Sequence, residues 1–487
     1  TSSCSDPRAF ADTHMNDPKT KIVATIGPAS SSKEVLREMM LSGLDVCRLN
    51  FSHGSYQFYA NLIGTIRELN TELGLTTAIL ADLQGPKMRV GEMADGPIDL
   101  PDGSELVITT DPIKGKPGIV STGYAQFPKD IKKGELVLLD DGKLRLEVIA
   151  TDGVKTVTTR VIHGGPLSSN KGLNLPNTKI SLPSLTEKDR LDLDFALDHD
   201  VDWIGLSFVR GARDIIELKH IIFQREKSAK VVAKIEKPEA LVEIDEIIRE
   251  ADALMVARGD LGVEIPMEKV PLVQKDIIRR CLLQHRPVIV ATQMMESMIT
   301  NITPTRAEVN DVANAVLDHA DAVMLSAETS VGRYPVETVK AMNRILLEME
   351  TSESMFNVEQ PDLPDNDRLV TDAICMASVR MAAAIDIKAI VTMTHSGYTA
   401  IKISSMRPKA HIFAFTSNRN ILCMLNLVWG VRAQYYDKTV STDHTIADIK
   451  HILRSKKLVQ KGDLVINTAS MPIAEQGMSN MLKLSAV

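Results

Sequence analysis

Hydrophobic positions follow two patterns that alternate along the chain from Lys21 onward. Short runs of consecutive apolar residues are typical of strands buried on both faces, and the stretches between them carry apolar residues three or four positions apart, which predicts amphipathic helices. Three such strands precede residue 86 and five follow residue 185: KIVATIG, DVCRLN and TAILADL, then WIGLSF, KVVAKIE, ALMVARG, PVIVATQM and AVMLSAET. Eight buried strands joined by helices predict an α/β fold, a parallel (β/α)8 TIM barrel formed by residues 19–86 and 185–356.

The pattern changes between residues 87 and 184, where short alternating runs are separated by turn residues such as Asp141-Gly142. Alternation at a period of two with hairpin turns predicts an antiparallel β structure. We therefore expect a β-rich lid domain inserted after the third barrel strand.

A charged, proline-marked linker, VEQPDLPDNDR, follows the barrel and precedes a second series of helices and strands at residues 357–487. Four helices, including ILCMLNLVWG, alternate there with four strands, which predicts a small doubly wound α/β domain. Residues 1–18 are polar and predict a disordered N-terminal arm.

Composition excludes several classes of function. The net charge is −7 and no basic cluster occurs, which argues against binding to nucleic acid. No apolar run reaches the roughly 18 residues of a membrane span. The five cysteines are odd in number and never spaced as C-x-x-C: Cys4, Cys47, Cys281, Cys375 and Cys423. This pattern favours a reducing compartment and hence the cytoplasm. An organellar destination after loss of a transit peptide stays open.

The strongest candidate chemistry lies at the end of the KVVAKIE strand. Lys234 and Glu236 are two residues apart, so they share one face of the strand, and Asp260 follows the next strand. Carboxylates from adjacent strand ends suit a hard divalent cation, Mg2+ or Mn2+. A surface Lys/Glu pair is the alternative for this stretch alone.

Other strand ends supply polar side chains beside this pair. The backbone N–H groups of Gly259 and Asp260, at the start of a short predicted helix, could hold an anionic group of a substrate. The segment RLNFSHG supplies groups for phosphate and cation contacts, namely Arg48, Asn50, Ser52 and His53. The last two strands supply candidates for proton transfer, namely Thr292, Ser326 and Glu328.

Six collinear motifs give the chain a resemblance to the pyruvate kinase family from about Thr20 to the C-terminus. They are TIGPAS, RLNFSHG, AKIEKPEA, ARGDLGVEI, ATQMMESM with PTRAEVNDVANAV, and DAVMLSAET with GRYPVETV. The resemblance implies the barrel, the inserted lid and a C-terminal regulatory domain. It also implies transfer of the phosphoryl group of phosphoenolpyruvate to ADP, giving pyruvate and ATP in glycolysis, and a homotetramer.

The resemblance carries over roles residue by residue. The implied catalytic residues are Lys234, Arg48, Thr292 and Ser326, and the implied substrate contacts are Gly259, Asp260, Thr292 and Ser207. The implied nucleotide contacts are Asn50, His53, Arg89 and Lys171, and the implied metal ligands are Glu236 and Asp260. The proton donor to the enolate stays open between the neighbourhoods of Thr292 and Ser326.

One segment departs from the commonest family pattern. K+-dependent members typically carry threonine-lysine after the aspartate of the third strand and a glutamate after Gly-Pro, whereas this chain reads DLQGPKMRV. We expect the Lys87 ammonium to replace a monovalent cation in the region of Asn50, Ser52, Asp82 and Leu83. The sequence thus resembles the K+-independent branch, and K+ is not expected to be required; a solvated lysine is the alternative.

The C-terminal domain contains a further candidate site in TMTHSGYTA, a strand, a polar loop and a helix start. Such a loop can cradle a phosphate on backbone N–H groups and hydroxyls. The resemblance implies a phosphorylated allosteric effector, and residues 471–480 could close over it. An ordinary strand–helix turn is the alternative. The candidate contacts are Thr394, His395, Ser396, Gly397 and Thr399.

Two other classes of function fit parts of the pattern. A lyase or aldolase could use the same metal site, but it would not need Arg89 in a lid or the phosphate cluster around Arg48. A catalytically silent paralogue would be expected to lack Lys234 or a metal ligand, and both are present here.

Overall fold

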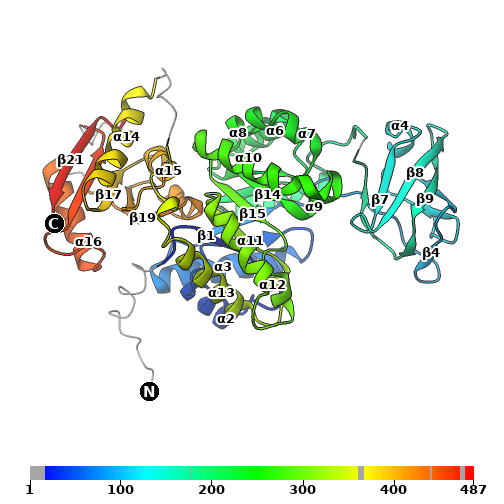
Figure 1. The fold of residues 1–487 in the computed structure, drawn as a ribbon, viewed down its shortest axis with the longest axis horizontal. Coiled ribbons are helices and arrows are strands. Elements are labelled where there is room, and N and C mark those ends of the chain that lie inside the picture. Colours follow the sequence, from blue (N-terminus) through cyan, green and yellow to red (C-terminus); the bar gives the residue numbers. More distant parts are fainter. Residues whose placement is uncertain (1–16, 177, 360–366, 439–440, 472–477) are drawn as a thin grey trace.

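The computed structural model describes residues 17–176, 178–359, 367–438, 441–471 and 478–487. Three bodies follow one another along its longest axis, with the barrel in the middle, the inserted domain at one end and the C-terminal domain at the other (Figure 1). None of the helices in these residues is long and apolar enough to cross a membrane. Most of the predicted N-terminal arm lies outside the described residues.

The predicted barrel is confirmed, with eight parallel strands closed into a ring in the order β1-β16-β15-β14-β13-β12-β3-β2. Their residues are almost all fully buried, because each strand is covered by side chains inside the ring and by helices outside it. The strands are β1 (Lys21–Thr25), β2 (Val46–Asn50), β3 (Ala78–Asp82), β12 (Trp203–Leu206), β13 (Lys230–Ile235), β14 (Ala253–Ala257), β15 (Val288–Ala291) and β16 (Ala322–Leu325).

Helices with identifiable caps surround these strands. Thr186 and Thr305 each form a capping box with the acidic residue three positions later, and Gly74 ends α3 at φ 65°. The outer helices are α2 (Lys33–Leu41), α3 (Tyr56–Leu73), α5 (Glu187–Asp198), α6 (Ala212–Gln224), α7 (Pro238–Val242), α8 (Ile244–Glu250), α9 (Arg258–Glu264), α10 (Val270–Leu283), α11 (Arg306–Leu317), α12 (Ala327–Ser330) and α13 (Pro335–Met349).

The inserted domain is the predicted β structure, with its own apolar core. A curled sheet has the order β11-β7-β8-β9-β5-β6, and β10 pairs with β4 separately. The elements are β4 (Ile98–Leu100), β5 (Glu105–Thr109), β6 (Ile119–Ser121), α4 (Phe127–Asp130), β7 (Leu136–Leu139), β8 (Leu144–Thr151), β9 (Thr156–His163), β10 (Gly165–Leu167) and β11 (Leu173–Asn174).

The C-terminal domain has a mixed sheet in the order β19-β18-β17-β20-β21, in which only β21 is antiparallel. Two details correct the sequence prediction. The segment ILCMLNLVWG, residues 421–430, does not form an α-helix: one 3-10 turn, Arg419–Ile421, ends at its first residue, and a second spans Met424–Leu427. Strand β21 is an additional strand. The elements are α14 (Leu369–Ala384), β17 (Ile387–Met393), α15 (Tyr398–Ser405), β18 (His411–Thr416), β19 (Val431–Tyr435), α16 (Thr442–Ser455), β20 (Leu464–Ala469) and β21 (Met481–Ala486).

The C-terminal domain packs on the end of the barrel where the strands begin. Lys21 Nζ donates to the carbonyl of Val431 at 3.2 Å, and the buried Arg407 guanidinium lies 3.1 Å from the Asp321 carboxylate. The inserted domain lies at the opposite end of the molecule (Figure 1). The carboxyl ends of the barrel strands therefore face the lid, and their amino ends face the C-terminal domain.

Candidate active site

Lys234 lies at the centre of the polar groups at the barrel mouth. Its ammonium donates to Ser207 Oγ at 2.6 Å and lies 3.0 Å from Glu236 Oε1 and 3.1 Å from Asp82 Oδ1. Burial would lower the pKa of Lys234, but the carboxylates of Asp82 and Glu236 outweigh it and hold the pKa above its usual range. The side chain is therefore a fixed cation, with only 11% of its surface exposed.

Glu236 is more deeply buried than Lys234. One carboxylate oxygen pairs with Lys234, and the other accepts a 2.7 Å hydrogen bond from the backbone N–H of Phe208. Burial raises the pKa of Glu236, and the nearby Asp260 charge raises it further. The two carboxylates thus lie close enough to repel each other electrostatically.

This donor set fits a hard divalent cation. Carboxylate oxygens are the ligands that Mg2+ prefers, and a cation between Glu236 and Asp260 would relieve their repulsion. Among the described residues no group of three or more His, Cys, Asp or Glu side chains is arranged to hold a metal ion alone. The remaining ligand positions would therefore belong to substrate oxygens and water, as is common for Mg2+.

Arg48 enters the same cluster from strand β2. Its Nε donates to Asp82 Oδ2 at 2.7 Å and its Nη1 donates to Thr25 Oγ1 at 2.8 Å. Burial would raise the pKa of Asp82, but Lys234 and Arg48 outweigh it and lower the pKa. Asp82 therefore stays ionised and holds both cations in place.

Strand β14 leads directly into helix α9, and the short helix predicted here begins at Arg258, before Gly259 and Asp260. The N–H of Gly259 donates to Thr292 Oγ1 at 2.7 Å, so the ends of two neighbouring strands meet there. Thr292 adopts φ 72°, which is rare for a β-branched residue and marks a locally strained site. Arg258 holds this segment by donating to the carbonyls of Ala291 and Thr292.

The remaining predicted groups occupy more varied positions. Ser326 lies at the end of β16, and Glu328 accepts from the N–H groups of Ser326 and Met295. Glu328 is thus a buried acceptor for backbone amides. The Asn50 carbonyl accepts from the Tyr59 hydroxyl on α3, and its side-chain oxygen accepts from the Ser52 N–H. His53 is exposed beside Ser52.

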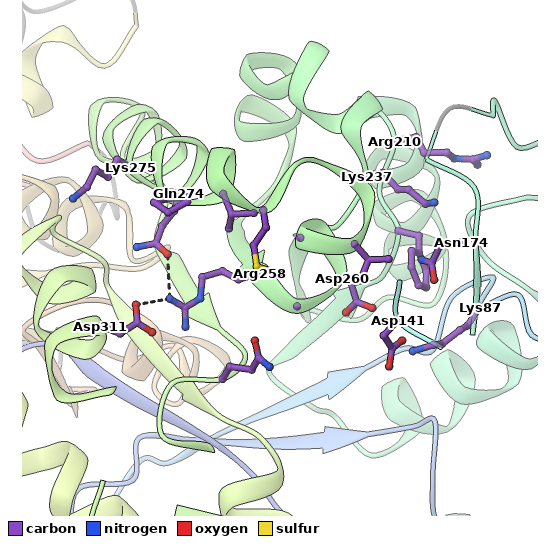
Figure 2. Close-up of a pocket in the computed structure, with 18 of the residues that line it drawn as sticks. Lys87, Asp141, Asn174, Arg210, Lys237, Arg258, Asp260, Gln274, Lys275 and Asp311 are labelled. Carbon is purple, nitrogen blue, oxygen red and sulfur yellow. Dashed lines mark hydrogen bonds and ion pairs between the residues drawn. The ribbon is translucent and has the colours of Figure 1, made fainter. Parts of the chain in front are cut away.

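A cavity of about 890 Å3 separates the barrel mouth from the lid. Figure 2 shows Asp260, Lys237 and Arg210 on its barrel side, facing Asn174, Asp141 and Lys87 near the lid. Of the predicted nucleotide contacts, Arg89 Nη1 donates to the carbonyl of Asn170, and Lys171 pairs with Asp140 at 2.8 Å.

Sequence reasoning missed several residues that line this cavity, among them Lys237, Arg258 and Asn174. Lys237 follows Glu236 and Arg258 precedes Gly259, so adjacency to a strand-end motif was a usable signal. Asn174 had no such signal, because only folding brings the lid to the barrel.

Lys87 does not lie where the sequence analysis expected it. It is exposed at the cavity rim near Asp141 (Figure 2), and no hydrogen bond or ion pair joins it to Asn50, Ser52 or Asp82 in the described part of the chain. Lys234 and Arg48 occupy the positions beside Asp82 instead.

Comparisons with known proteins agree with this architecture. A family model described as "Pyruvate kinase, barrel domain" matches residues 17–339, and one described as "Pyruvate kinase, alpha/beta domain" matches residues 372–485. The chain belongs to the pyruvate kinase family. It is accordingly a phosphotransferase of glycolysis that transfers the phosphoryl group of phosphoenolpyruvate to ADP, giving pyruvate and ATP, and its family uses a divalent metal.

Full-length relatives support the assignment. The chain is 44% identical to the pyruvate kinase of Geobacillus stearothermophilus over 471 residues, which are 96% of this chain and 80% of that protein. It is 42% identical over 474 residues to the pyruvate kinase of Staphylococcus aureus strain MRSA252, with the same coverage. A crystal structure of a pyruvate kinase from Cryptosporidium parvum superposes with a TM-score of 0.90 at 34% identity, covering 98% of this chain and 97% of the other.

Proposed function

We propose that Lys234 and Arg48 neutralise the phosphoryl group while it passes from phosphoenolpyruvate to ADP, and that Glu236 and Asp260 hold the divalent cation. The observation that carries this proposal is the Lys234 ammonium, 3.0 Å from Glu236 Oε1 at the mouth of the barrel. Phosphoryl transfer is catalysed mainly by positioning and by electrostatic stabilisation. Bound Mg2+ or Mn2+ would add positive charge for the phosphoryl and enolate oxygens.

Phosphoenolpyruvate would place its carboxylate on the amides of Gly259 and Asp260. The Gly259 N–H donates to the Thr292 hydroxyl at 2.7 Å, so the substrate oxygen would replace that acceptor. Ser207 would keep the Lys234 ammonium in position, since its hydroxyl accepts a hydrogen bond from the ammonium and donates one to the carbonyl of Leu83. Thr292 and Ser326 mark the side from which the enolate would receive its proton.

ADP would bind between barrel and lid. Arg89 and Lys171, on neighbouring lid segments, would contact its phosphates, and Asn50 and His53 would approach it from the barrel. The antiparallel bridge between Arg89 and Gly172 supports a joint role, because it fixes Arg89 beside the residue that follows Lys171. Closure of the lid domain, residues 87–184, would bring these cations to the transferred group.

We also propose that turnover is independent of K+. Support comes from the sequence departure at Leu83, Gln84, Lys87 and Val90 and from Asp82, whose charge is already matched by Lys234 and Arg48. Lys87 lies at the cavity rim, so its approach to Asn50, Ser52 and Asp82 would accompany closure of the lid.

The C-terminal domain, residues 357–487, would bind a phosphorylated effector at Thr394, His395, Ser396, Gly397 and Thr399. Gly397 adopts φ 86° at the start of α15, and the hydroxyls of Thr394 and Ser396 accept from the N–H groups of Gly397 and Tyr398. A phosphate could take over these donors. Most of the predicted closing loop, residues 471–480, lies outside the described residues.

We propose a homotetramer as the working assembly. The sheet edge at β21 supports an intermolecular contact, because an edge strand presents unpaired backbone groups. The four cysteines in the described part of the chain carry free thiols, in keeping with the predicted cytoplasmic compartment.

The direct test is pyruvate formation from phosphoenolpyruvate with Mg2+, in the presence and absence of ADP. ADP-dependent pyruvate and ATP formation in equal amounts is expected. Pyruvate formation without ADP would indicate a lyase-like or hydrolytic activity, and a folded but inactive protein would indicate the catalytically silent alternative.

A further inference from the structure

A buried polar cluster joins the lid to the barrel beside the proposed active site. Lys237 Nζ lies 2.7 Å from Glu264 Oε1, and the Asn174 amide donates to the same oxygen at 2.8 Å. Lys237 follows the metal candidate Glu236, Glu264 ends helix α9, and Asn174 belongs to lid strand β11. Three separate parts of the molecule therefore meet at one carboxylate oxygen.

The ion pair in this cluster is nearly inaccessible to water, and Asn174 is half-buried beside it. The exposed fraction of the side chain is 5% for Lys237 and 1% for Glu264. The other carboxylate oxygen, Oε2, is buried and has no hydrogen-bond partner among the described residues. A buried carboxylate with few partners depends strongly on each one, so the Asn174 hydrogen bond has more effect here than it would on an exposed surface.

The lid also lies close to α9 at a second place. A Cβ atom placed on Gly142, in the lid turn after β7, would lie 3.7 Å from Val263 Cγ1 on α9. The lid thus approaches α9 closely at a backbone turn and binds it through a charged hydrogen bond, and both places border the cavity lined by Asp141, Gly259 and Asp260. Figure 2 shows Asn174 and Lys237 side by side at this boundary.

The connection continues to both proposed substrate sites. Lys171, a proposed nucleotide contact, is three residues before Asn174, and the bridge between Arg89 and Gly172 fixes a second such contact to the same segment. On the other side, α9 starts with the residues proposed to hold the carboxylate of phosphoenolpyruvate. Glu264 is therefore the point at which a displacement of β11 would reach α9.

We propose that Glu264 is a positioning residue that ties lid strand β11 to helix α9 through Asn174, so that ADP on the lid and phosphoenolpyruvate on α9 are held in register. Glu264 itself does not touch the reacting atoms. The inference deepens the proposed function, because it rests on Arg89 and Lys171 as nucleotide contacts.

A donor–acceptor exchange tests the proposal. N174D places a carboxylate against Glu264, and E264Q leaves Lys237 without its ionic partner. In the double variant N174D/E264Q, the new amide can donate to the new carboxylate while its oxygen accepts from Lys237, so the hydrogen bonds and total charge are restored. N301D and E268Q make the same changes at exposed positions.

We expect N174D to raise the KM for ADP at least about tenfold with a smaller change in the KM for phosphoenolpyruvate, and the double variant to return within about threefold of the parent protein. Hydrogen exchange of residues 170–176 and 258–264 should increase together in N174D and recover together in the double variant. Both controls should behave like the parent.

Single variants with parental kinetics and exchange, or a double variant as impaired as the product of its single changes, would overturn the proposal. If E264Q does not fold, the N174A variant tests the proposal instead, because it removes only the side-chain amide. An unchanged KM for ADP and unchanged hydrogen exchange in N174A would then refute the proposal. A K171M variant with a parental KM for ADP would contradict the nucleotide assignment, whereas the exchange data test the β11–α9 connection separately.

Discussion

Lys234 and Asp82 form a buried ion pair across strand β12, with 3.1 Å between Nζ and Oδ1. Arg48 binds the other oxygen of Asp82, so one carboxylate orients two cations at the mouth of the barrel. Such preorganised cations need little rearrangement when negative charge moves during phosphoryl transfer. The pair also explains how Lys234 remains charged despite its burial.

Replacing Lys234 by methionine should keep the fold and reduce kcat by at least about 10²–10³-fold, the usual effect of removing one electrostatic group from a transition state. The loss of a partner for Asp82 and Glu236 should also lower the melting temperature moderately. Steady-state kinetics and calorimetry measure the two effects. Lys230→Met, on the same strand but at its other end, is the matched control, and a K234M variant with near-normal kcat would contradict the assignment.

Glu236→Gln should raise the Mg2+ concentration needed for half-maximal activity by at least about tenfold, because the neutral amide is a weaker ligand for a hard cation. A Mg2+ titration at saturating substrates measures this change. Glu239→Gln, three residues further on, should leave the titration unaltered. The same curve for E236Q and the parent protein would exclude Glu236 as a ligand.

Activity should be the same within about twofold when tetramethylammonium replaces K+ at constant ionic strength, since screening is then unchanged. Lys87→Glu, which restores the acid of the K+-dependent pattern, should lower activity without K+ and make added K+ stimulatory. Initial rates over a K+ titration measure both. Strong stimulation of the parent protein by K+ would refute the proposal.

Ser396→Ala and Thr399→Ala should each weaken the response to a phosphorylated effector without changing the basal rate. Ser396 lies in the loop before α15 and Thr399 in the first turn of that helix, 71 and 74 residues after Leu325 at the end of the last barrel strand. The KM for phosphoenolpyruvate should be measured with fructose bisphosphate, another sugar phosphate and a nucleoside monophosphate. A response that survives in both variants would identify the loop as an ordinary turn.

His285 should make the protein less stable in mild acid. Burial lowers its pKa from 6.5 to about 4, and Lys402, whose ammonium lies 2.6 Å from Nε2, contributes to the same shift. Asp372 acts in the opposite direction and Arg286 in the same direction as burial. Below pH 6.5 the unfolded chain binds a proton that the folded protein does not, so the free energy of unfolding falls as pH falls toward 4.

At pH 5 this effect amounts to roughly 1–2 kcal/mol. His285→Gln should therefore show a smaller decrease in unfolding free energy between pH 7 and pH 5 than the parent protein. Denaturant unfolding at the two pH values measures the difference, and His53→Gln, at an exposed position, is the control. Equal decreases in H285Q and the parent would show that His285 does not cause the acid sensitivity.

The sequence by itself determined the barrel, the insertion and the strand-end motifs, because buried parallel strands leave continuous apolar runs and motifs such as AKIEKPEA follow them directly. It placed Lys234 beside Glu236, since side chains two residues apart share a face of a strand. The 3-10 turns at residues 419–427 and strand β21 could not be predicted from the sequence. Their apolar residues pack against the neighbouring domain and sheet, and this packing, not a local helical or strand periodicity, decides their structure.

Only the tertiary structure decided which distant groups meet. The pairing of Lys234 with Asp82 and of Asn174 with Glu264 joins residues 152 and 90 positions apart. No local periodicity encodes such distances; they follow from closure of the barrel and from the way the lid returns to its rim.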